Sequence, residues 1–409
     1  MQPRFSGRKD EFTLKILVIN AGSSSLKYQL FNTTSGEILA KGICERIGIG
    51  GNVKHTPLGG ETVAHEVSLP THSDAIREVI RLLTNGVIES MSEIDAVGHR
   101  VLHGGAEFSG SVLVDDAVIE AIKLCIPLGP LHNPANLTGI LACREAMGET
   151  PQIAVFDTAF HQTMPAHAYL YALPYEYYEK YQVRRYGFHG TSHRYVFAKA
   201  AEFLGKPASG LKIVTCHLGN GSSIAAVKNG KCVDTTMGLT PLEGLPMGTR
   251  TGSIDPAIVK FICDAEGISV DEITDIMNKK SGMLGVSGVS SDFRDLFAAR
   301  DAGNDRAKMA LDIFTYSIKK YIGAYAAAMG GIDAVVFTAG VGENNASIRS
   351  DSVSGLEFMG IAIDEEKNSR RGEWDISAAG SRVKTLVVPT DEEFVIAADT
   401  EEIINSLKA

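Results

Sequence analysis

Apolar runs that suit buried strands alternate along the chain with stretches whose apolar residues recur every three or four positions. Residues 75–83, AIREVIRLL, have this helical spacing and precede a strand-like run at 94–98. A longer helix is expected from Asn304 or Asp305, a plausible N-cap, to the stop at Gly330 and Gly331, followed by a strand over 334–338. The alternation predicts α/β architecture.

One pattern occurs twice. Residues 16–28, ILVINAGSSSLKY, and residues 214–227, VTCHLGNGSSIAAV, each read as an apolar strand, a turn of small residues and a second strand-like segment. Ser23–Leu26 aligns with Gly221–Ile224. Two copies in separate halves of the chain predict two duplicated domains that face each other.

The small residues of these turns suit phosphate. A turn of Gly and Ser lets backbone N–H groups converge on an anion, and hydroxyl groups add donors. Lys27 follows Ser25 by two residues, so on a strand both face the same side and the ammonium could reach a phosphate. Asn20 could orient a hydrated magnesium ion. The structural alternatives are an ordinary hairpin turn, a surface lysine and an asparagine that caps the turn.

A third Gly-rich turn, residues 337–344 (FTAGVGEN), follows the late strand, a place where α/β proteins bind nucleotides. The sequence contains neither G-x-x-x-x-G-K-[ST] nor G-x-G-x-x-G. A P-loop and a dinucleotide fingerprint are therefore excluded, and a different phosphate-handling fold is needed.

The charge balance constrains the partners. A formal net charge of -10 opposes binding to nucleic acid and to anionic membranes, so an anionic substrate needs a local cationic pocket or a metal ion. No stretch reaches the roughly 18 apolar residues of a membrane helix, and residues 1–13 read as a loose extension without a signal-peptide core. The six cysteines form no C-x-x-C pair, which fits reduced thiols in the cytoplasm.

Loops rich in Gly, His and Arg lie between and just beyond the two similar turns. They are residues 98–105 (GHRVLHGG), 155–161 (VFDTAFH), 184–193 (RRYGFHGTSH) and 238–250 (GLTPLEGLPMGTR). Their composition is typical of sites rather than cores. The flanking glycines and arginine argue against zinc at the paired histidines, and His103 and His193 are interpreted as buried structural histidines.

These segments, with VINAGSSSLKYQLF, HLGNGSS, TAGVGENNASIR and PTDEE, resemble the acetate kinase family in order from about Leu14 to nearly the C-terminus. The resemblance implies a two-domain fold of the sugar-kinase, chaperone and actin superfamily, which is ribonuclease H-like. It also implies magnesium-dependent transfer between ATP and acetate that gives ADP and acetyl phosphate, with Mn²⁺ as a possible substitute, and a homodimer.

The resemblance also implies roles for individual residues. Asn20 and Glu392 match its magnesium-associated positions, with Glu393 as a neighbour of Glu392, and Arg100 matches the arginine that holds the carboxylate. The implied catalytic residues are Asp157, His189 and Arg250. The implied nucleotide contacts are Lys27, His217, Leu218, Gly219, Asn220, Gly221, Asp292, Phe293, Arg294, Gly340, Val341, Gly342, Glu343 and Asn344. The implied apolar pocket for the acyl group is Leu102, Leu131, Phe188 and Pro241.

The chemistry refines two of these roles. A small carboxylic acid is already ionised at neutral pH, so its attack needs no general base, and metal or water positioning suits Asp157 better, with structural hydrogen bonding as the alternative. Arg100 can hold a carboxylate with two hydrogen bonds. If Arg100 were only an ion-pair partner, its loss would change stability more than substrate affinity.

The sequence departs from the family pattern at Leu102, where acetate enzymes commonly have valine and propionate enzymes alanine, and at Ala339, where glycine is common. A larger Leu102 should favour acetate, although a methylene is worth only about 1–3 kcal/mol. We expect an N-terminal domain of residues 14–158 and 388–409 and a nucleotide-binding domain of residues 159–387 that closes over it. The alternatives are a propionate or butyrate kinase and a nucleotide-gated binding protein of the actin and chaperone type.

Overall fold

The computed structural model describes residues 13–130 and 132–408. It divides into two compact units: unit 1 holds the described residues up to Ala159 and those from Asp391 onward, and unit 2 holds Phe160–Thr390. The expected boundaries lay after residues 158 and 387, and residues 1–12 of the expected extension lie outside the described residues. That each unit folds as a domain, and that one closes over the other, stay predictions.

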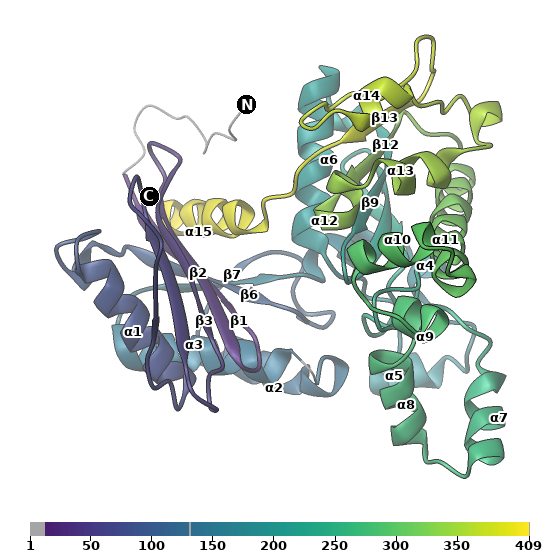
Figure 1. Cartoon of the computed structure of the whole chain (residues 1–409). Coiled ribbons are helices and arrows are strands. Elements are labelled where there is room, and N and C mark those ends of the chain that lie inside the picture. The colour runs from purple at the N-terminus through teal and green to yellow at the C-terminus, as the bar shows by residue number, and fades with distance from the viewer. Residues whose placement is uncertain (1–12, 131, 409) are drawn as a thin grey trace. The chain divides into compact units, whose positions relative to one another are not determined.

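Unit 1 is built on a mixed sheet with the strand order β5-β4-β3-β2-β1-β6-β8-β7 (Figure 1). Its strands are β1 (Lys15–Ala21), β2 (Ser25–Asn32), β3 (Glu37–Glu45), β4 (Asn52–Pro57), β5 (Val63–Glu66), β6 (Ala96–Val101), β7 (Val112–Leu113) and β8 (Gln152–Phe156). Its helices are α1 (His72–Thr84), α2 (Asp116–Leu124), α3 (Asn133–Met147), α15 (Glu392–Lys408) and the short 3-10 turns η1 (Met91–Glu93) and η2 (Ile126–Leu128); η3 (Ala159–Thr163) runs into unit 2.

Both faces of this sheet are covered near β1, because successive side chains of a strand point to opposite sides. Leu17 and Ile19 pack in one core with α1 and α3, while Ile16 and Val18 pack in another with α15. Beyond helix α15, the outer strands β2–β4 carry polar residues on this face of the sheet, such as Lys27, Lys41 and Lys54.

Unit 2 contains a sheet with the order β11-β10-β9-β12-β13 (Figure 1). Its strands are β9 (Lys212–Leu218), β10 (Ser222–Lys228), β11 (Lys231–Thr235), β12 (Ala334–Thr338) and β13 (Lys384–Val387). Its helices are α4 (Ala166–Tyr169), α5 (Glu176–Tyr181), α6 (Gly190–Leu204), α7 (Ala257–Glu266), α8 (Val270–Lys279), α9 (Gly282–Ser287), α10 (Phe293–Asp301), α11 (Asp305–Met329), α12 (Ala339–Asn344), α13 (Ala346–Val353) and α14 (Glu365–Ser369), with 3-10 turns η4 (Ala208–Gly210) and η5 (Glu357–Met359).

This sheet is also covered on both faces. Val214 and Cys216 pack against α11 on one side, and Ile213 packs against α6 on the other. The predicted long helix is confirmed: the side chain of Asn304 accepts a hydrogen bond from the backbone N–H of Ala307, and Gly330 ends the helix with a φ of 70°. The strand expected at 334–338 is β12.

The repeated sequence pattern corresponds to a repeated structure. β1 and β2 form an antiparallel hairpin whose first strand lies parallel to β6, and β9 and β10 form an antiparallel hairpin whose first strand lies parallel to β12. The two small-residue turns therefore occupy corresponding positions in the two units. The α/β fold with duplicated halves is confirmed.

Two further expectations concern the whole chain. Among the described residues, no helix combines the length and apolar character needed to cross a membrane. All six cysteines are free thiols.

Candidate active site

In unit 1 a cavity of about 210 Å³ brings four of the expected site residues together. Asn20 comes from the end of β1, Lys27 from β2, and Arg100 and Leu102 from the end of β6 and the residue just beyond it. The remaining lining residues are Ala21, Gly22, Ser25, His132 and Asn136. Ser25 and Lys27 share this cavity, as their alternation on a strand predicted.

Arg100 is held by Asp157 behind it. The guanidinium donates from Nε to Oδ1 at 3.1 Å and from Nη2 to Oδ2 at 2.7 Å, and Asp157 is fully buried while the Arg100 side chain is 26% exposed. The carboxylate of Asp157 raises the pKa of Arg100 far above its usual range; burial opposes this and Glu392 and Glu393 add to it. The ion pair uses Nε and Nη2, Arg100 also lines the cavity, and its Nη1 has no hydrogen-bond partner among the described residues.

This geometry narrows the role of Asp157. Both of its carboxylate oxygens bind Arg100, and its backbone N–H donates to the carbonyl of Val101 at 3.0 Å. These hydrogen bonds are those of the structural alternative, and they hold the Arg100 side chain against Asp157. Positioning of metal or water by Asp157 stays a prediction.

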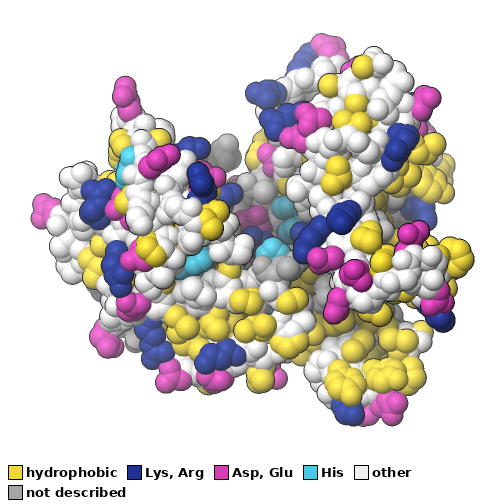
Figure 2. Space-filling model, turned by 60° about the horizontal axis from the view of Figure 1, so that its bottom comes forward, with side chains coloured by type: hydrophobic (Ala, Val, Ile, Leu, Met, Phe, Trp, Pro, Cys, Tyr) yellow, Lys and Arg dark blue, Asp and Glu magenta, His cyan; other side chains and the backbone are white. Residues whose placement is uncertain are grey.

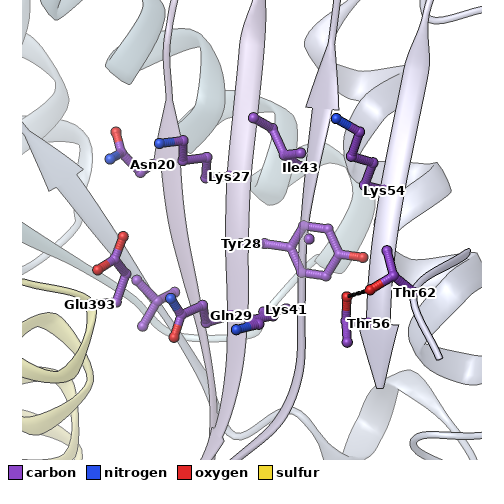
Figure 3. A pocket seen from close by; sticks show the side chains of 12 residues that line it. Asn20, Lys27, Tyr28, Gln29, Lys41, Ile43, Lys54, Thr56, Thr62 and Glu393 are labelled. Carbon is purple, nitrogen blue, oxygen red and sulfur yellow. Dashed lines mark hydrogen bonds between the residues drawn. The ribbon is translucent and has the colours of Figure 1, made fainter. Parts of the chain in front are cut away.

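A second cavity of about 310 Å³ shares Asn20 and Lys27 with the first and lies on the open face of β1–β4 (Figure 3). The strand register explains its lining. One cross-strand row runs Asn20, Lys27, Ile43, Lys54 and the next runs Val18, Gln29, Lys41, Thr56. All eight side chains therefore face the same side.

This face is cationic in an acidic protein. Lys27 and Lys41 form no ion pair with any described residue, and Lys54 meets only Glu45, at 3.7 Å with both side chains largely exposed. An exposed ion pair of this kind contributes little to the free energy of folding. Figure 3 shows Glu393 on the α15 side of the cavity, near Asn20.

The oxygen groups here fit a magnesium ion. The amide of Asn20 and the carboxylate of Glu393 line one cavity, and Glu392 lies near enough to Arg100 to raise its pKa. Among the described residues no three His, Cys, Asp or Glu side chains cluster as a ready-made metal cage. Two or three protein oxygens suit an ion that keeps several waters and binds phosphate oxygens as well.

In unit 2, His189 and Arg250 both lie close to Gly221. A side-chain carbon at Gly221 would be 3.6 Å from both Arg250 Nη1 and His189 Nε2. Since glycine leaves this space open, two cationic or proton-donating groups face one position above the second small-residue turn. The structure therefore brings together the two residues that the resemblance paired, although their catalytic roles stay predictions.

The backbone holds both residues firmly. His189 precedes α6 in the left-handed region, with φ 57° and ψ 27°, a conformation that costs a non-glycine residue about 1–2 kcal/mol. Strain of this kind persists only where the surrounding structure enforces it. The loop that carries Arg250 is fastened to the turn, because the backbone N–H of Gly248 donates to the carbonyl of Asn220 at 3.0 Å.

This contact requires glycine at position 248. A side-chain carbon there would lie 1.8 Å from Asn220 Oδ1. Arg250 Nη1 donates to the carbonyl of Pro241 at 3.1 Å, and burial lowers the pKa of Arg250. The loop 238–250 thus folds back on the turn and directs its arginine toward Gly221.

The residues expected to contact the nucleotide differ in burial: some have side chains in the hydrophobic core and others have exposed side chains. Leu218, Phe293 and Val341 belong to the hydrophobic core around α11, so any contact they make with a nucleotide comes from the backbone. Asp292 caps α10 and accepts hydrogen bonds from the Arg294 side chain, which lower its pKa to about 2. Arg294 is 88% exposed.

The backbone conformation of Ala339 explains why glycine is common at this position. Ala339 begins α12 with a φ of 62°, a backbone conformation that favours glycine. Its methyl group lies 3.9 Å from the position of a side-chain carbon at Gly219, so the turn at 339–342 touches the turn at 219–221.

The four residues expected in the acyl pocket lie in different surroundings, and their role stays a prediction. Leu102 lines the smaller cavity beside Arg100 and is 6% exposed. Leu131 lies outside the described residues. Phe188 is buried, its carbonyl bound to His161 Nε2 at 2.9 Å, and Pro241 lies beside Arg250.

Comparison with known proteins decides the family. The model of the Acetokinase family matches residues 15–398. The chain belongs to the acetokinase family. It is 60% identical over 400 residues to an acetate kinase of Thermoanaerobacterium thermosaccharolyticum, covering 97% of this chain and all of that one.

Two solved structures of this family are similar to it. One is the acetate kinase of Porphyromonas gingivalis, with a TM-score of 0.91 and 51% identity, covering 95% of this chain and 99% of that one. The other is a propionate kinase of Francisella tularensis, with a TM-score of 0.90 and 42% identity over the same shares of the two chains.

Some residues around the acetokinase site were not anticipated from the sequence. Lys41 and Lys54 lie on the same face of the sheet as Lys27. On β4 the alternation of polar residues was an available signal, whereas on β3 the residues two positions before and after Lys41 are apolar. Asn136 lines the smaller cavity; its side chain accepts from Leu102 N–H at 3.0 Å and donates to the Ala21 carbonyl at 2.8 Å. No local pattern marks such a long-range bridge.

Proposed function

We propose that this chain is a kinase that reversibly transfers a phosphoryl group between ATP and acetate, giving ADP and acetyl phosphate. Membership of the acetokinase family supports the reaction class. The observation that carries the proposal is the pairing of Arg250 Nη1 and His189 Nε2 over the open position at Gly221.

Phosphoryl transfer needs this kind of surrounding. The migrating group spreads negative charge over three oxygens, and preorganised donors stabilise it without covalent chemistry. Arg250 supplies a permanent cation, and His189 supplies an imidazole nitrogen beside the same position. Acetate is already ionised at neutral pH, so no base is required in the direction of acetyl phosphate formation.

Arg100 is proposed to orient acetate. Two of its nitrogens are held by the buried Asp157 and the side chain lines the cavity, so the remaining N–H groups are available to a carboxylate. Leu102 lines the same cavity and is proposed to contact the methyl group of acetate.

Magnesium is proposed as the cofactor, with Mn²⁺ as a substitute, near Asn20, Glu392 and Glu393. When bound, it would neutralise charge on the phosphate oxygens of the nucleotide. Lys27, beside Asn20, is proposed to contact a phosphate as well.

A coupled assay with acetate, ATP and Mg²⁺ tests the reaction, read out by trapping acetyl phosphate with hydroxylamine. We expect acetyl hydroxamate in proportion to ADP. Folded protein that releases phosphate at the same rate with and without acetate would contradict the proposal, as would protein that binds ATP without turnover.

Propionate is the second candidate substrate, because one of the similar structures is a propionate kinase. kcat/KM measured across formate, acetate, propionate and butyrate separates the two. The variant Leu102→Ala is expected to shift the ratio of propionate to acetate upward by about 10-fold or more, within the range of one to two methylenes. An unchanged ratio would remove Leu102 from the acyl pocket.

A homodimer is also proposed, and exposed apolar side chains of unit 2 support it. Hydrophobic side chains gather at the lower right of Figure 2, over the part of unit 2 that carries α7 and α8. Phe261 is 73% exposed and Val270 65%, while Tyr316 on α11 is 62% exposed. Light scattering on the purified protein and on Phe261→Asp tests whether this surface pairs two copies. A cytoplasmic location is proposed from the six free thiols.

A further inference from the structure

A buried network of imidazoles and hydroxyls supports His189 from behind. Its Nδ1 lies 2.9 Å from Ser223 Oγ, and the same hydroxyl lies 2.8 Å from Nε2 of His193. His193 Nδ1 lies 2.7 Å from Thr215 Oγ1, which reaches the carbonyl of Ala225 at 3.4 Å. Ser223, His193 and Thr215 are all fully buried.

The direction of these hydrogen bonds follows from the carbonyl at the end. A carbonyl only accepts, so Thr215 donates to Ala225 and its oxygen accepts from Nδ1–H of His193. Burial, with His161 and His217 adding to it, holds the pKa of His193 well below its usual value. The ring is therefore neutral and has one N–H, so its Nε2 accepts the proton of Ser223.

The same network determines which ring nitrogen of His189 carries its proton. With its proton given to His193, the hydroxyl of Ser223 accepts from Nδ1–H of His189. His189 therefore keeps a proton on Nδ1, and only Nε2, the atom facing the position above Gly221, gains or loses one. The ring plane is held separately, because His217 stacks on His189 with centroids 4.1 Å apart and an angle of 20°.

We propose that Ser223, backed by His193, is a positioning residue that directs Nε2 of His189 toward the transferring phosphoryl group and fixes its Nδ1 as a hydrogen-bond donor. This rests on the proposed function. Donation from Nε2 of His189 to a phosphoryl oxygen then requires the imidazolium form, in which both ring nitrogens carry a proton. The proton on Nδ1 is held by its hydrogen bond to Ser223 Oγ. The Ser223 hydroxyl does not touch the substrate.

The test uses Ser223→Ala in the full-length protein, with Thr235→Val as the matched control. Thr235 is equally buried in the same sheet, and its hydroxyl donates to the Ile224 carbonyl at 3.1 Å without contacting a histidine. We expect kcat of Ser223→Ala to fall between about 10-fold and 100-fold, as for a misplaced catalytic group, with KM for acetate within about twofold. Thr235→Val should lower Tm by a similar amount and keep kcat within about twofold.

Two further measurements separate positioning from structure. His193→Gln alone should lower kcat in the same way, and adding it to Ser223→Ala should cost less than about twofold more, because both changes break one chain of hydrogen bonds. Ser223→Thr keeps a hydroxyl and should recover part of kcat. Equal loss of kcat in Ser223→Ala and Thr235→Val, or additive losses in the double variant, would overturn the proposal.

A direct readout is independent of turnover. In long-range ¹H–¹⁵N spectra of histidine-labelled protein above pH 8, we expect His189 protonated at Nδ1, and a shift toward protonation at Nε2 in Ser223→Ala. Protonation at Nε2 in the wild type would overturn the proposal even if acetate is phosphorylated. Protonation at Nδ1 in a protein that does not phosphorylate acetate would instead reject only the proposed function.

Discussion

Asp157 lies fully buried beneath Arg100 and binds the guanidinium through both carboxylate oxygens, at 3.1 Å and 2.7 Å. Removing the acid leaves a partly buried cation, which costs about 3 kcal/mol. Asp157→Ala is therefore expected to lower the free energy of unfolding in urea by about that amount. It should also raise KM for acetate, because Arg100 loses its fixed orientation.

Arg100→Gln provides the comparison. If Arg100 holds the carboxylate, this variant should raise KM for acetate at least as much as Asp157→Ala, while both destabilise the fold. A loss of stability in Arg100→Gln with KM for acetate unchanged would reduce the arginine to an ion-pair partner.

The two hairpins and α11 were predictable because their signals are local. Strands, small-residue turns, the Asn304 cap and the Gly330 stop all lie within a few residues of the feature that they determine. The shared cavity of Lys27, Lys41 and Lys54 was not predictable, since it depends on which strands are neighbours and on their register.

Tertiary packing also decides which of the expected site residues have their side chains in the core. Leu218 and Phe293 belong to sequence motifs of the family, yet their side chains fill the core beside α11. Ser223 stands in the second small-residue turn pattern, where the sequence suggests a phosphate donor. Its hydroxyl instead points to two histidines, one of them 30 residues away.

Ala339 offers a prediction about strain. Its φ of 62° costs an L-residue about 1–2 kcal/mol, and glycine adopts it freely but loses more entropy on folding. Ala339→Gly is therefore expected to stabilise the fold by about 1 kcal/mol in urea unfolding. Ala302→Gly, at a φ of −81° after α10, is the control and should not stabilise it. A less stable Ala339→Gly would show that the methyl contact near Gly219 outweighs the strain.

His99 makes stability depend on pH. Burial lowers its pKa from 6.5 to about 4, with its hydrogen bond to Gln152 opposing the shift. Between these values the unfolded chain binds a proton that the folded chain does not, so stability is complete above pH 6.5 and falls as the pH approaches 4. The shift corresponds to about 3 kcal/mol. Buried His193 acts in the same direction.

Urea unfolding at several pH values checks this. His99→Gln should be less stable at pH 7 and lose less stability between pH 6.5 and 4 than the wild type. Parallel curves for the two proteins would show that His99 is protonated in the folded state or that its site opens first.

Lys41 and Lys54 extend the charge of Lys27 across one face of the unit 1 sheet. Every substrate of the proposed reaction is an anion, whereas the whole chain has a net charge of -10, so these lysines should attract substrate locally. Two unit charges about 10 Å apart in water interact with an energy of roughly 0.4 kcal/mol. Lys41→Gln and Lys54→Gln are therefore each expected to lower kcat/KM for the nucleotide about twofold at low salt.

Salt separates attraction from direct contact. The Debye length shrinks from about 10 Å at 0.1 M to about 3 Å at 1 M, so the variants should converge on the wild type as ionic strength rises. Lys123→Gln, on α2 and paired with Glu120, changes the net charge equally and serves as the control. If it had the same effect as Lys41→Gln, the overall charge would be responsible. If the deficit of Lys41→Gln persisted at high salt, Lys41 would be a direct ligand of the phosphate.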